Sequence, residues 1–424
     1  MKKIICSPVS LLPDNTDPDI NYFALFSYAP HGRDDIGYIA PSLPTDIRRD
    51  GLAPSVRAWD FTTIALSIAA ADKATLREKS ADGWTRMIDV SVSLREPAVW
   101  EARRIELESV LRFLTGDFWS LHFLDGGMET PKAKQPRGTN ADCVCLLSGG
   151  ADSLVGAIDL VSVGKKPLFV SQVVRGDQET QKRYATELGA ADRHCQWSFP
   201  VSHSGESEKS TRGRSIVFFA FAAIAASAIS SDNDHPVEIV VPENGFISLN
   251  VPLGPGRLGS LSTKTTHPVY MTGIQSIWDA VGIHARLVFP YRGKTKGEVL
   301  TDCTNQALLT DLIGASVSCG KYQRHNLTHC GECVPCLVRR AAFLVAGMQD
   351  TTLKGYLCEQ LSHSQSRDVA AAAVAYLRYQ QNGIRRFVGG ALSFASPDER
   401  PLYEGVVARG MDELGMLLKS HGVL

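Results

Sequence analysis

Residues 147–154 have the sequence Leu-Ser-Gly-Gly-Ala-Asp-Ser-Leu, and they lie directly between a short apolar segment at 144–147 and a segment of helical spacing at 153–163. A loop that leaves a strand and enters a helix lies at the carboxyl edge of an α/β sheet, where ligands bind. Two glycines let backbone N–H groups face one concavity, and the helix start adds the positive end of a dipole. The stretch therefore predicts a loop that binds phosphate or pyrophosphate.

The side chains of this loop suit the same ligand. Ser148 and Ser153 offer hydroxyl donors, and Asp152 can orient the loop or hold Mg²⁺. In a plainer alternative, the glycines only form a turn and Asp152 or Ser153 caps the helix. The position of the loop between a strand and a helix favours the phosphate-binding interpretation.

Two other nucleotide-binding motifs find no support in the sequence. Gly293-Lys294-Thr295 is the only Gly-Lys-Thr, and Val288 stands where a Walker A loop needs a glycine. The stretch 254–259 matches the dinucleotide pattern Gly-x-Gly-x-x-Gly, but it follows a proline-broken loop and opens no helix. The loop at 147–154 is therefore the candidate phosphate site.

Beyond the loop, apolar strand-like segments alternate with helical ones. Such alternation predicts a parallel sheet with crossover helices. We therefore expect an open, doubly wound α/β domain over 141–343. Its strands are expected at 144–147, 167–173, 195–197, 237–241 and 285–289, and its helices at 153–163, 178–188, 269–281 and from about 215 and 295.

Segments on both sides of this domain complete the predicted organisation. Residues 1–124 contain an alternating stretch at 87–94, typical of a half-buried strand, and then helical spacing that Gly116 is placed to end. They predict a smaller α+β accessory domain. Residues 125–140 are rich in Gly, Pro and Lys and predict a linker. Residues 344–424 predict a helical C-terminal extension, in which we expect no catalytic group with a partner.

Four of the ten cysteines form a cluster with metal-ligand spacing: Cys319, Cys330, Cys333 and Cys336. Four thiolates at such spacings can close a tetrahedron around Zn²⁺, which leaves no open position for catalysis, so a structural zinc is expected. An iron–sulfur cluster and unligated core thiols are the alternatives. His325 and His329 lie inside the cluster's loop and can replace a cysteine.

Three further positions stand near the ends of predicted strands or the start of a helix. Each is more often a solvated surface group when taken singly. Arginines at a helix entry can bind phosphate or carboxylate oxygens, and strand ends deliver side chains to a ligand edge. The candidates are Arg212 and Arg214 before the apolar helix, Glu243 and Asn244 after the strand at 237–241, and Lys294 and Lys296 after the strand at 285–289.

Charge and composition exclude several classes of protein. Lys plus Arg (44) nearly balances Asp plus Glu (45), so the chain lacks the basic excess of a nucleic-acid binder. The start at 1–6 soon meets Pro8 and Asp14, which argues against a signal peptide. The apolar stretch 216–229 is too short to cross a bilayer and predicts a buried helix. We expect a cytoplasmic protein, with homo-oligomerisation left open.

The motifs together resemble a known enzyme family. The Ser148–Ser153 loop is similar to the pyrophosphate loop of N-type ATP pyrophosphatases, and the cysteine cluster, followed by Arg339, resembles the zinc site of their 7-cyano-7-deazaguanine synthase (QueC) branch. Gly213-Arg214, Glu243, and Pro290 with Lys296 resemble family elements in the same order. The resemblance covers about 141–343 and implies a HUP-like fold.

The resemblance also implies cofactors and residue roles. It implies ATP, Mg²⁺ and structural Zn²⁺. It assigns ATP and pyrophosphate binding to Ser148, Gly149, Gly150, Asp152 and Ser153, catalysis to Asp152, Arg214 and Lys296, substrate binding to Glu243, and the metal to Cys319, Cys330, Cys333 and Cys336.

The chain departs from the compact biosynthetic enzyme at three places. The family's Tyr-Pro-Asp-Cys element has no counterpart between Asn250 and Tyr270, where a Gly- and Thr-rich loop stands instead. Arg212 replaces a proline and Ser215 an asparagine. The flanking segments look like those of QueC-like proteins from bacterial anti-phage operons, the QatC group. That likeness implies defence rather than tRNA-base synthesis.

Three functions therefore stay open. The first is an AMP- and pyrophosphate-forming ligase that activates a 7-deazaguanine carboxylate and transfers it to an amine on a partner protein from the same operon. The second is a nitrile synthase that uses ammonia. The third is a nucleotide-binding scaffold subunit of a defence complex.

Overall fold

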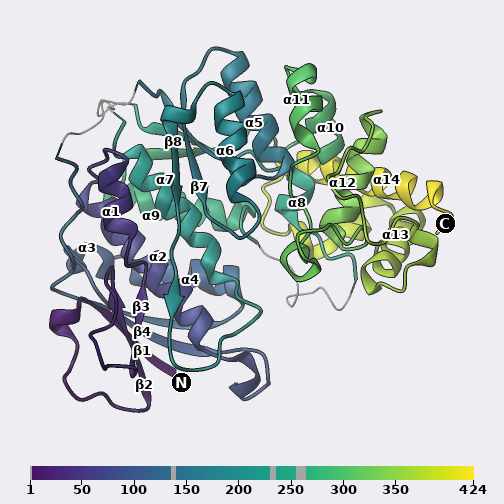
Figure 1. Cartoon of the computed structure of the whole chain (residues 1–424). Coiled ribbons are helices and arrows are strands. Elements are labelled where there is room, and N and C mark those ends of the chain that lie inside the picture. Colours follow the sequence, from purple (N-terminus) through teal and green to yellow (C-terminus); the bar gives the residue numbers. More distant parts are fainter. Residues whose placement is uncertain (1, 135–139, 230–234, 255–263) are drawn as a thin grey trace.

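The computed structural model describes residues 2–134, 140–229, 235–254 and 264–424, which form two sheets followed by a helical region (Figure 1). Strands pair in parallel throughout both sheets, except for one two-residue strand. The protein is therefore α/β with a helical C-terminal region, as the sequence predicts.

The sheet that carries the glycine-rich loop has the order β11-β10-β6-β7-β8, and each predicted strand of this region is present. Numbered along the chain from β6, this is the order 3-2-1-4-5, in which the order reverses between β6 and β10. The strands are β6 (Cys143–Leu146), β7 (Pro167–Gln172), β8 (His194–Trp197), β10 (Val237–Val240) and β11 (Ala285–Val288).

Helices cover both faces of this sheet. One core contains apolar residues of α5 (Ala151–Ser162), α6 (Gln178–Glu187), α10 (Lys296–Thr301) and α11 (Gln306–Ile313). The core on the opposite face contains α7 (Ile216–Ala226) and α9 (Pro268–Val281). The sheet is thus wound on both faces.

The first sheet has the order β5-β4-β1-β2-β3-β9. Its strands are β1 (Lys2–Ser7), β2 (Ile20–Leu25), β3 (Ile36–Ile39), β4 (Met87–Ser93), β5 (Phe118–Leu124) and β9 (Val201–Ser202). Helices α1 (Leu43–Arg49) and α2 (Val56–Ala74) lie between β3 and β4, and α3 (Pro97–Glu101) and α4 (Arg104–Thr115) lie between β4 and β5. The expected α+β character of this region is wrong. Strands β1 to β5 all pair in parallel, so the region is α/β like the one that follows it.

Strand β4 also differs from the expected half-buried strand. Every residue of β4 after Met87 is buried, because the strand lies between β1 and β5 in the sheet interior. Its polar side chains find partners there, since the Ser93 hydroxyl lies 2.8 Å from that of Ser7. The expected helix end at Gly116 is confirmed, with φ at 77°.

The two sheets share one hydrophobic core. Helix α2, which lies between strands of the first sheet, packs against α7, which covers the second sheet. One cluster of buried residues includes both helices and strands of both sheets. Strand β9, which follows β8 along the chain, pairs antiparallel with β3 and completes the first sheet. The sequence boundary at 124–141 therefore does not separate two cores.

The expected linker packs against the first unit where it is described. Gly127 donates its N–H to the Leu94 carbonyl at 3.0 Å, and Ala133 donates to the Leu52 carbonyl at 3.2 Å. Residues 135–139 lie outside the described residues.

The C-terminal region is helical, as expected. Helices α12 (Val334–Val345), α13 (Arg367–Val388) and α14 (Arg400–Ser420) form a third core together with α8 (Gly245–Leu249). None of the helices in the described part of the chain has the length and apolar character that crossing a bilayer requires.

Candidate functional site

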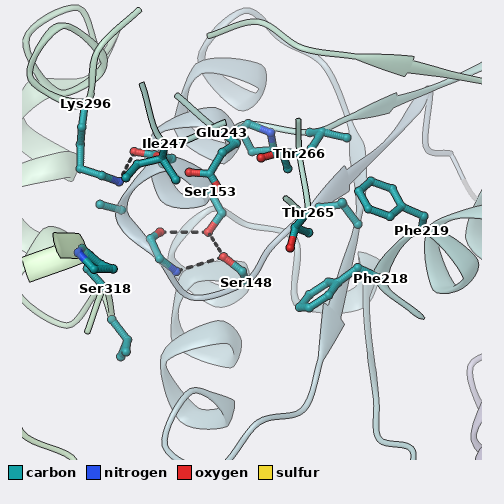
Figure 2. A pocket seen from close by; sticks show the side chains of 18 residues that line it. Ser148, Ser153, Phe218, Phe219, Glu243, Ile247, Thr265, Thr266, Lys296 and Ser318 are labelled. Carbon is teal, nitrogen blue, oxygen red and sulfur yellow. Dashed lines mark hydrogen bonds and ion pairs between the residues drawn. The ribbon is translucent and has the colours of Figure 1, made fainter. Parts of the chain in front are cut away.

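The glycine-rich loop connects β6 to α5 at the carboxyl edge of the second sheet. Gly149 has a φ of 87°, a conformation that favours glycine and turns the chain into the helix. The Ser148 hydroxyl lies 3.1 Å from that of Ser153, and it also accepts the Gly150 N–H at 3.3 Å. Gln181 holds the loop from below through the Ser148 carbonyl, at 3.1 Å. The loop thus presents two hydroxyls beside the start of a helix (Figure 2).

Asp152, in the first turn of α5, is the centre of a buried polar cluster. Lys296 Nζ lies 2.6 Å from its Oδ1, and Asn244 Nδ2 donates to Oδ2 at 2.6 Å. The backbone N–H of Asn244 adds a third contact at 3.3 Å. Glu243 shares a hydrogen bond with the same carboxylate. Four candidate groups from three separate parts of the sequence therefore meet: Asp152, the adjacent Glu243 and Asn244, and Lys296.

The pKa values of the two carboxyl groups in the cluster shift in opposite directions. Burial acts to raise the pKa of Asp152, but the Lys296 charge and the hydrogen bonds from Glu243, Lys296 and Asn244 outweigh it and lower that pKa. Burial and the neighbouring Asp152 carboxylate raise the pKa of Glu243 well above its ordinary value. Of the two groups, Asp152 is therefore the one that favours the ionised form and Glu243 the one that favours the proton.

The cluster lies at the topological switch point of the sheet. Strand β6 leads into α5 on one face, whereas β10 leads through α8 to α9 on the other. Loops that diverge in this way leave a crevice at the carboxyl edge, which is where open α/β sheets bind ligands. Asp152 follows β6 and Glu243 follows β10, so both carboxyl groups border this crevice.

A cavity of about 330 Å³ occupies this position. Figure 2 shows Lys296 and Ser318 on one side of it, Phe218 and Phe219 on the other, and the loop serines between them. Ile247, Thr265 and Thr266 also line it, together with the carboxyl groups of Asp152 and Glu243. Its size is at the lower end of that of small-molecule pockets, and it combines apolar walls with a few convergent polar groups, as ligand sites do.

Comparisons of the chain with protein-family models, with curated proteins and with solved structures find no match. The chemistry of this protein is therefore inferred from the geometry of the cluster and the cavity.

The remaining basic candidates have other surroundings. Arg212 is buried against the first unit, where its backbone N–H bonds Asp72 at 2.6 Å. Arg214 is exposed and is not among the residues that line the cavity. Its charge lowers the pKa of the Asp177 carboxyl, against a larger effect of burial that raises it. Lys294 pairs with Asp302 at 3.0 Å. Lys296 is thus the basic candidate that the fold brings to the cavity.

The loop that carries the family departure is described only in part. Residues 255–263, including most of the Gly-x-Gly-x-x-Gly match, lie outside the described residues. Thr265 and Thr266, which follow them, line the cavity.

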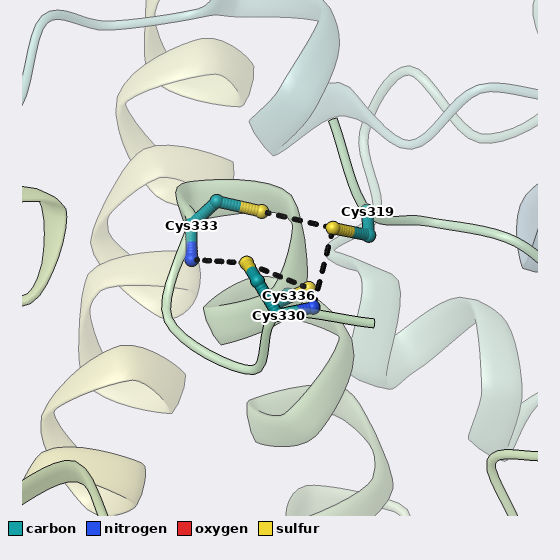
Figure 3. A group of neighbouring side chains, drawn as sticks. All are labelled: Cys319, Cys330, Cys333 and Cys336. Carbon is teal, nitrogen blue, oxygen red and sulfur yellow. Dashed lines mark hydrogen bonds between the residues drawn. The ribbon is translucent and has the colours of Figure 1, made fainter. Parts of the chain in front are cut away.

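The four cysteines form a buried cluster that suits a metal ion such as zinc (Figure 3). Their four Sγ atoms all lie within 4.8 Å of one another, a spread that fits tetrahedral coordination by sulfur. Backbone N–H groups point at the sulfurs, with that of Cys330 at 3.4 Å from the Cys319 Sγ. His329 lies beside the cluster and accepts the Ser318 N–H through Nε2 at 3.3 Å.

The cysteine cluster is connected to the glycine-rich loop. Val317, two residues before Cys319, donates its N–H to the Gly149 carbonyl at 3.0 Å. Ser318 and Pro335, which adjoin two of the cysteines, line the cavity. A metal ion held by the four cysteines would therefore fix one wall of the cavity and the loop beside it.

Sequence reasoning missed one group at this site, Glu413 of α14. Its side chain is buried and accepts two hydrogen bonds, one from the Thr295 hydroxyl and one from the Gly297 N–H at 3.3 Å. These residues flank Lys296. The only sequence signal is a lone acid among the apolar positions of a helix, which is indistinguishable from a surface charge without the tertiary contact.

Proposed function

We propose that this protein is an ATP-dependent adenylating enzyme of the QueC-like, N-type ATP-pyrophosphatase kind, with a HUP-like fold. The single observation that carries the proposal is the placement of the Ser148–Ser153 loop and Asp152 at the switch point between β6 and β10. The strand order supports it, since this order binds nucleotides at that crevice. The glycine geometry supports a phosphate ligand rather than a simple helix cap.

The residues of the cavity have a role in each part of such a reaction. The loop hydroxyls and the first N–H groups of α5 are placed to bind the pyrophosphate that leaves. Lys296 adds a positive charge as negative charge builds on the phosphates. Mg²⁺, when bound, would be held by Asp152 and neutralise the phosphate oxygens. Asp152 fits this role because it is the ionised carboxyl of the cluster.

The reaction that follows from these roles has two steps. A substrate carboxylate oxygen attacks the α-phosphorus of ATP, the bond from that phosphorus to the bridging oxygen breaks, and pyrophosphate leaves. An amine then attacks the acyl carbon of the adenylate, AMP leaves with the former carboxylate oxygen, and the amine loses a proton. Adenylation is needed because an amine cannot displace oxide from a carboxylate.

We propose a 7-deazaguanine carboxylate as the substrate. Phe218, half-buried at the mouth of the cavity, offers a face on which a fused ring can stack. The Glu243 carboxyl bonds Asp152 through its proton, and its other oxygen can accept a hydrogen bond from the N–H groups of a guanine-like edge. The acceptor amine that we propose lies on a partner protein encoded with this chain in an anti-phage operon.

Product analysis with Mg²⁺-ATP and 7-carboxy-7-deazaguanine tests the proposal. We expect AMP and pyrophosphate from the wild type, and loss of this turnover in Asp152→Asn. The control is Asp159→Asn on the same helix, whose carboxylate bonds Tyr291 and Thr304 away from the cavity. ADP as the main product contradicts the proposal. A free nitrile formed from ammonium, with no mass added to any partner protein, identifies a nitrile synthase instead.

A further inference from the structure

Helix α14 of the C-terminal region holds the turn that leads into α10. Arg409 donates through Nη2 to the Gly293 carbonyl at 2.8 Å and pairs with the Glu298 carboxylate. One turn further along α14, Glu413 accepts from Thr295 and Gly297. These contacts come from two side chains of α14 that are four residues apart and therefore lie on one face of the helix.

These contacts bracket Lys296. Thr295 is the N-cap of α10, and its hydroxyl accepts the Glu298 N–H at 3.1 Å while donating to Glu413. Gly297 lies so close to α14 that a Cβ added there would be 2.5 Å from the Glu413 Oε1. The residue between them therefore has its backbone fixed on both sides by one carboxylate, and its side chain reaches Asp152.

The same helix also packs on the other partner of Asp152. Asn244 is the N-cap of α8, and the ring of Phe246 in α8 contacts α14 at Gly410, where a Cβ would meet the ring. Helix α14 thus contacts both α10 and α8, whose N-terminal ends bring Lys296 to Oδ1 and Asn244 to Oδ2 of Asp152.

We propose that Glu413 is a positioning residue of the site, which places the Lys296 ammonium on Asp152 by fixing Thr295 and Gly297. The C-terminal extension then completes the phosphate-binding end of the cavity. The positioning follows from the contacts alone, and only its effect on turnover rests on the proposed function. The placement is unfavourable for Glu413 itself, because burial raises its pKa to about 7 in spite of the two hydrogen bonds.

Three variants separate positioning from simple loss of fold. Glu413→Gln keeps the shape of the side chain and one acceptor. Glu413→Ala removes both acceptors. Gly297→Ala leaves Glu413 in the chain and displaces its carboxylate from the opposite side, although alanine itself favours a helix. The matched control is Glu404→Gln on the same helix, which removes an ion pair with Arg400 away from the 293–298 turn.

The first measurement is independent of any activity. Full-length protein is treated with an amine-acetylating reagent, and acetylation of Lys296 is followed by peptide mass spectrometry against the exposed Lys182. Local opening should make Lys296 react roughly three- to tenfold faster in Glu413→Ala and Gly297→Ala, with Glu413→Gln between them and the wild type. Amide exchange over 293–301 should rise in the same order, and Glu404→Gln should match the wild type.

Turnover of ATP to AMP is measured on the same samples. We expect kcat to fall in the order of the acetylation rates, with the KM for the carboxylate substrate little changed. Unchanged Lys296 reactivity and amide exchange in both Glu413→Gln and Gly297→Ala overturns the positioning role. Absence of AMP formation by the wild type overturns the proposed function and leaves the acetylation result to decide the role of Glu413.

Discussion

Asp152 shows how strongly one residue of this site depends on its neighbours. The residue is 4% exposed, and its carboxylate balances the charge of Lys296, a residue that is 7% exposed. Removing one member of a buried pair typically costs about 3–5 kcal/mol, because the other charge is left uncompensated. The sequence motif predicts which residue faces the ligand, but the dependence of Lys296 on Asp152 follows only from their contact.

The pair predicts different outcomes for two substitutions at position 152. Asp152→Ala leaves Lys296 and the Glu243 proton without their shared acceptor, and we expect it to lose roughly 3 kcal/mol of folding stability. Asp152→Asn keeps the shape and one acceptor and should lose less. Urea denaturation of both variants measures the difference. Equal stability of the two would show that Lys296 finds another partner.

Glu413 predicts a pH dependence of stability. Its pKa rises from 4.5 to about 7 on folding, mainly through burial. Between these pH values the folded state holds a proton that the unfolded chain has released, so the group lowers stability as pH rises through this window, by on the order of 3 kcal/mol. Glu413→Gln cannot titrate, so we expect its stability to fall less than that of the wild type from pH 5 to pH 8.

Denaturation midpoints across this range provide the test. Asp177 and Glu243 also have raised pKa values and contribute the same sign in both proteins, so the comparison isolates Glu413. Parallel stability curves for the two proteins would contradict the prediction.

At the level of elements, local patterns predicted the second sheet well and the first sheet poorly. The loop at 147–154 and the strands after it have short apolar runs with clear turn residues between them. Helix α2 has no polar face, and its buried Asp60 and Asp72 are satisfied by tertiary contacts, so periodicity gives no signal. The parallel pairing of β1 with β4 brings together segments far apart in sequence, which no local pattern encodes.

The glycines at the two ends of α5 allow the role of the loop to be separated from the stability of the helix. Gly149 and Gly164 adopt φ values of 87° and 82° before and after α5, and a Cβ at Gly164 meets nothing within 4 Å. Alanine at either position should cost about 1 kcal/mol of backbone strain. Only Gly149→Ala should also weaken ATP binding, measured by calorimetry. Equal loss of binding in Gly164→Ala would show that helix stability, not loop geometry, controls the site.

At the level of the whole molecule, the cysteine cluster joins the C-terminal region to the carboxyl edge of the second sheet. The spacing of the cysteines predicts the cluster because its ligands are close in sequence. The hydrogen bond from the Val317 N–H, beside the cluster, to the Gly149 carbonyl joins segments separated by more than 160 residues. No local sequence pattern predicts such a contact. The same holds for Glu413, which is 118 residues from Thr295.

Metal removal should therefore affect the loop as well as the fold. We expect one zinc per chain, and Cys333→Ser should lower zinc content, soluble yield and melting temperature together, because structural zinc in small sites contributes on the order of 10 kcal/mol. Residual folded protein should bind ATP more weakly, through the freed Val317–Gly149 contact. Cys358→Ser is the control, since this thiol bonds the Gln360 carbonyl outside the cluster. Iron in place of zinc, or an unchanged melting temperature, would reject the assignment.

Strand β9 has a consequence for how this chain is made on the ribosome. The first sheet has five of its strands as soon as residue 124 has emerged, but the edge of β3 stays unpaired until Val201 and Ser202 follow. Translation at roughly 5–20 residues per second leaves that edge, and the apolar surface of α2 that α7 later covers, open for several seconds. During this interval a nascent chain presents an unprotected strand edge, which makes it a natural client for a chaperone at the exit tunnel.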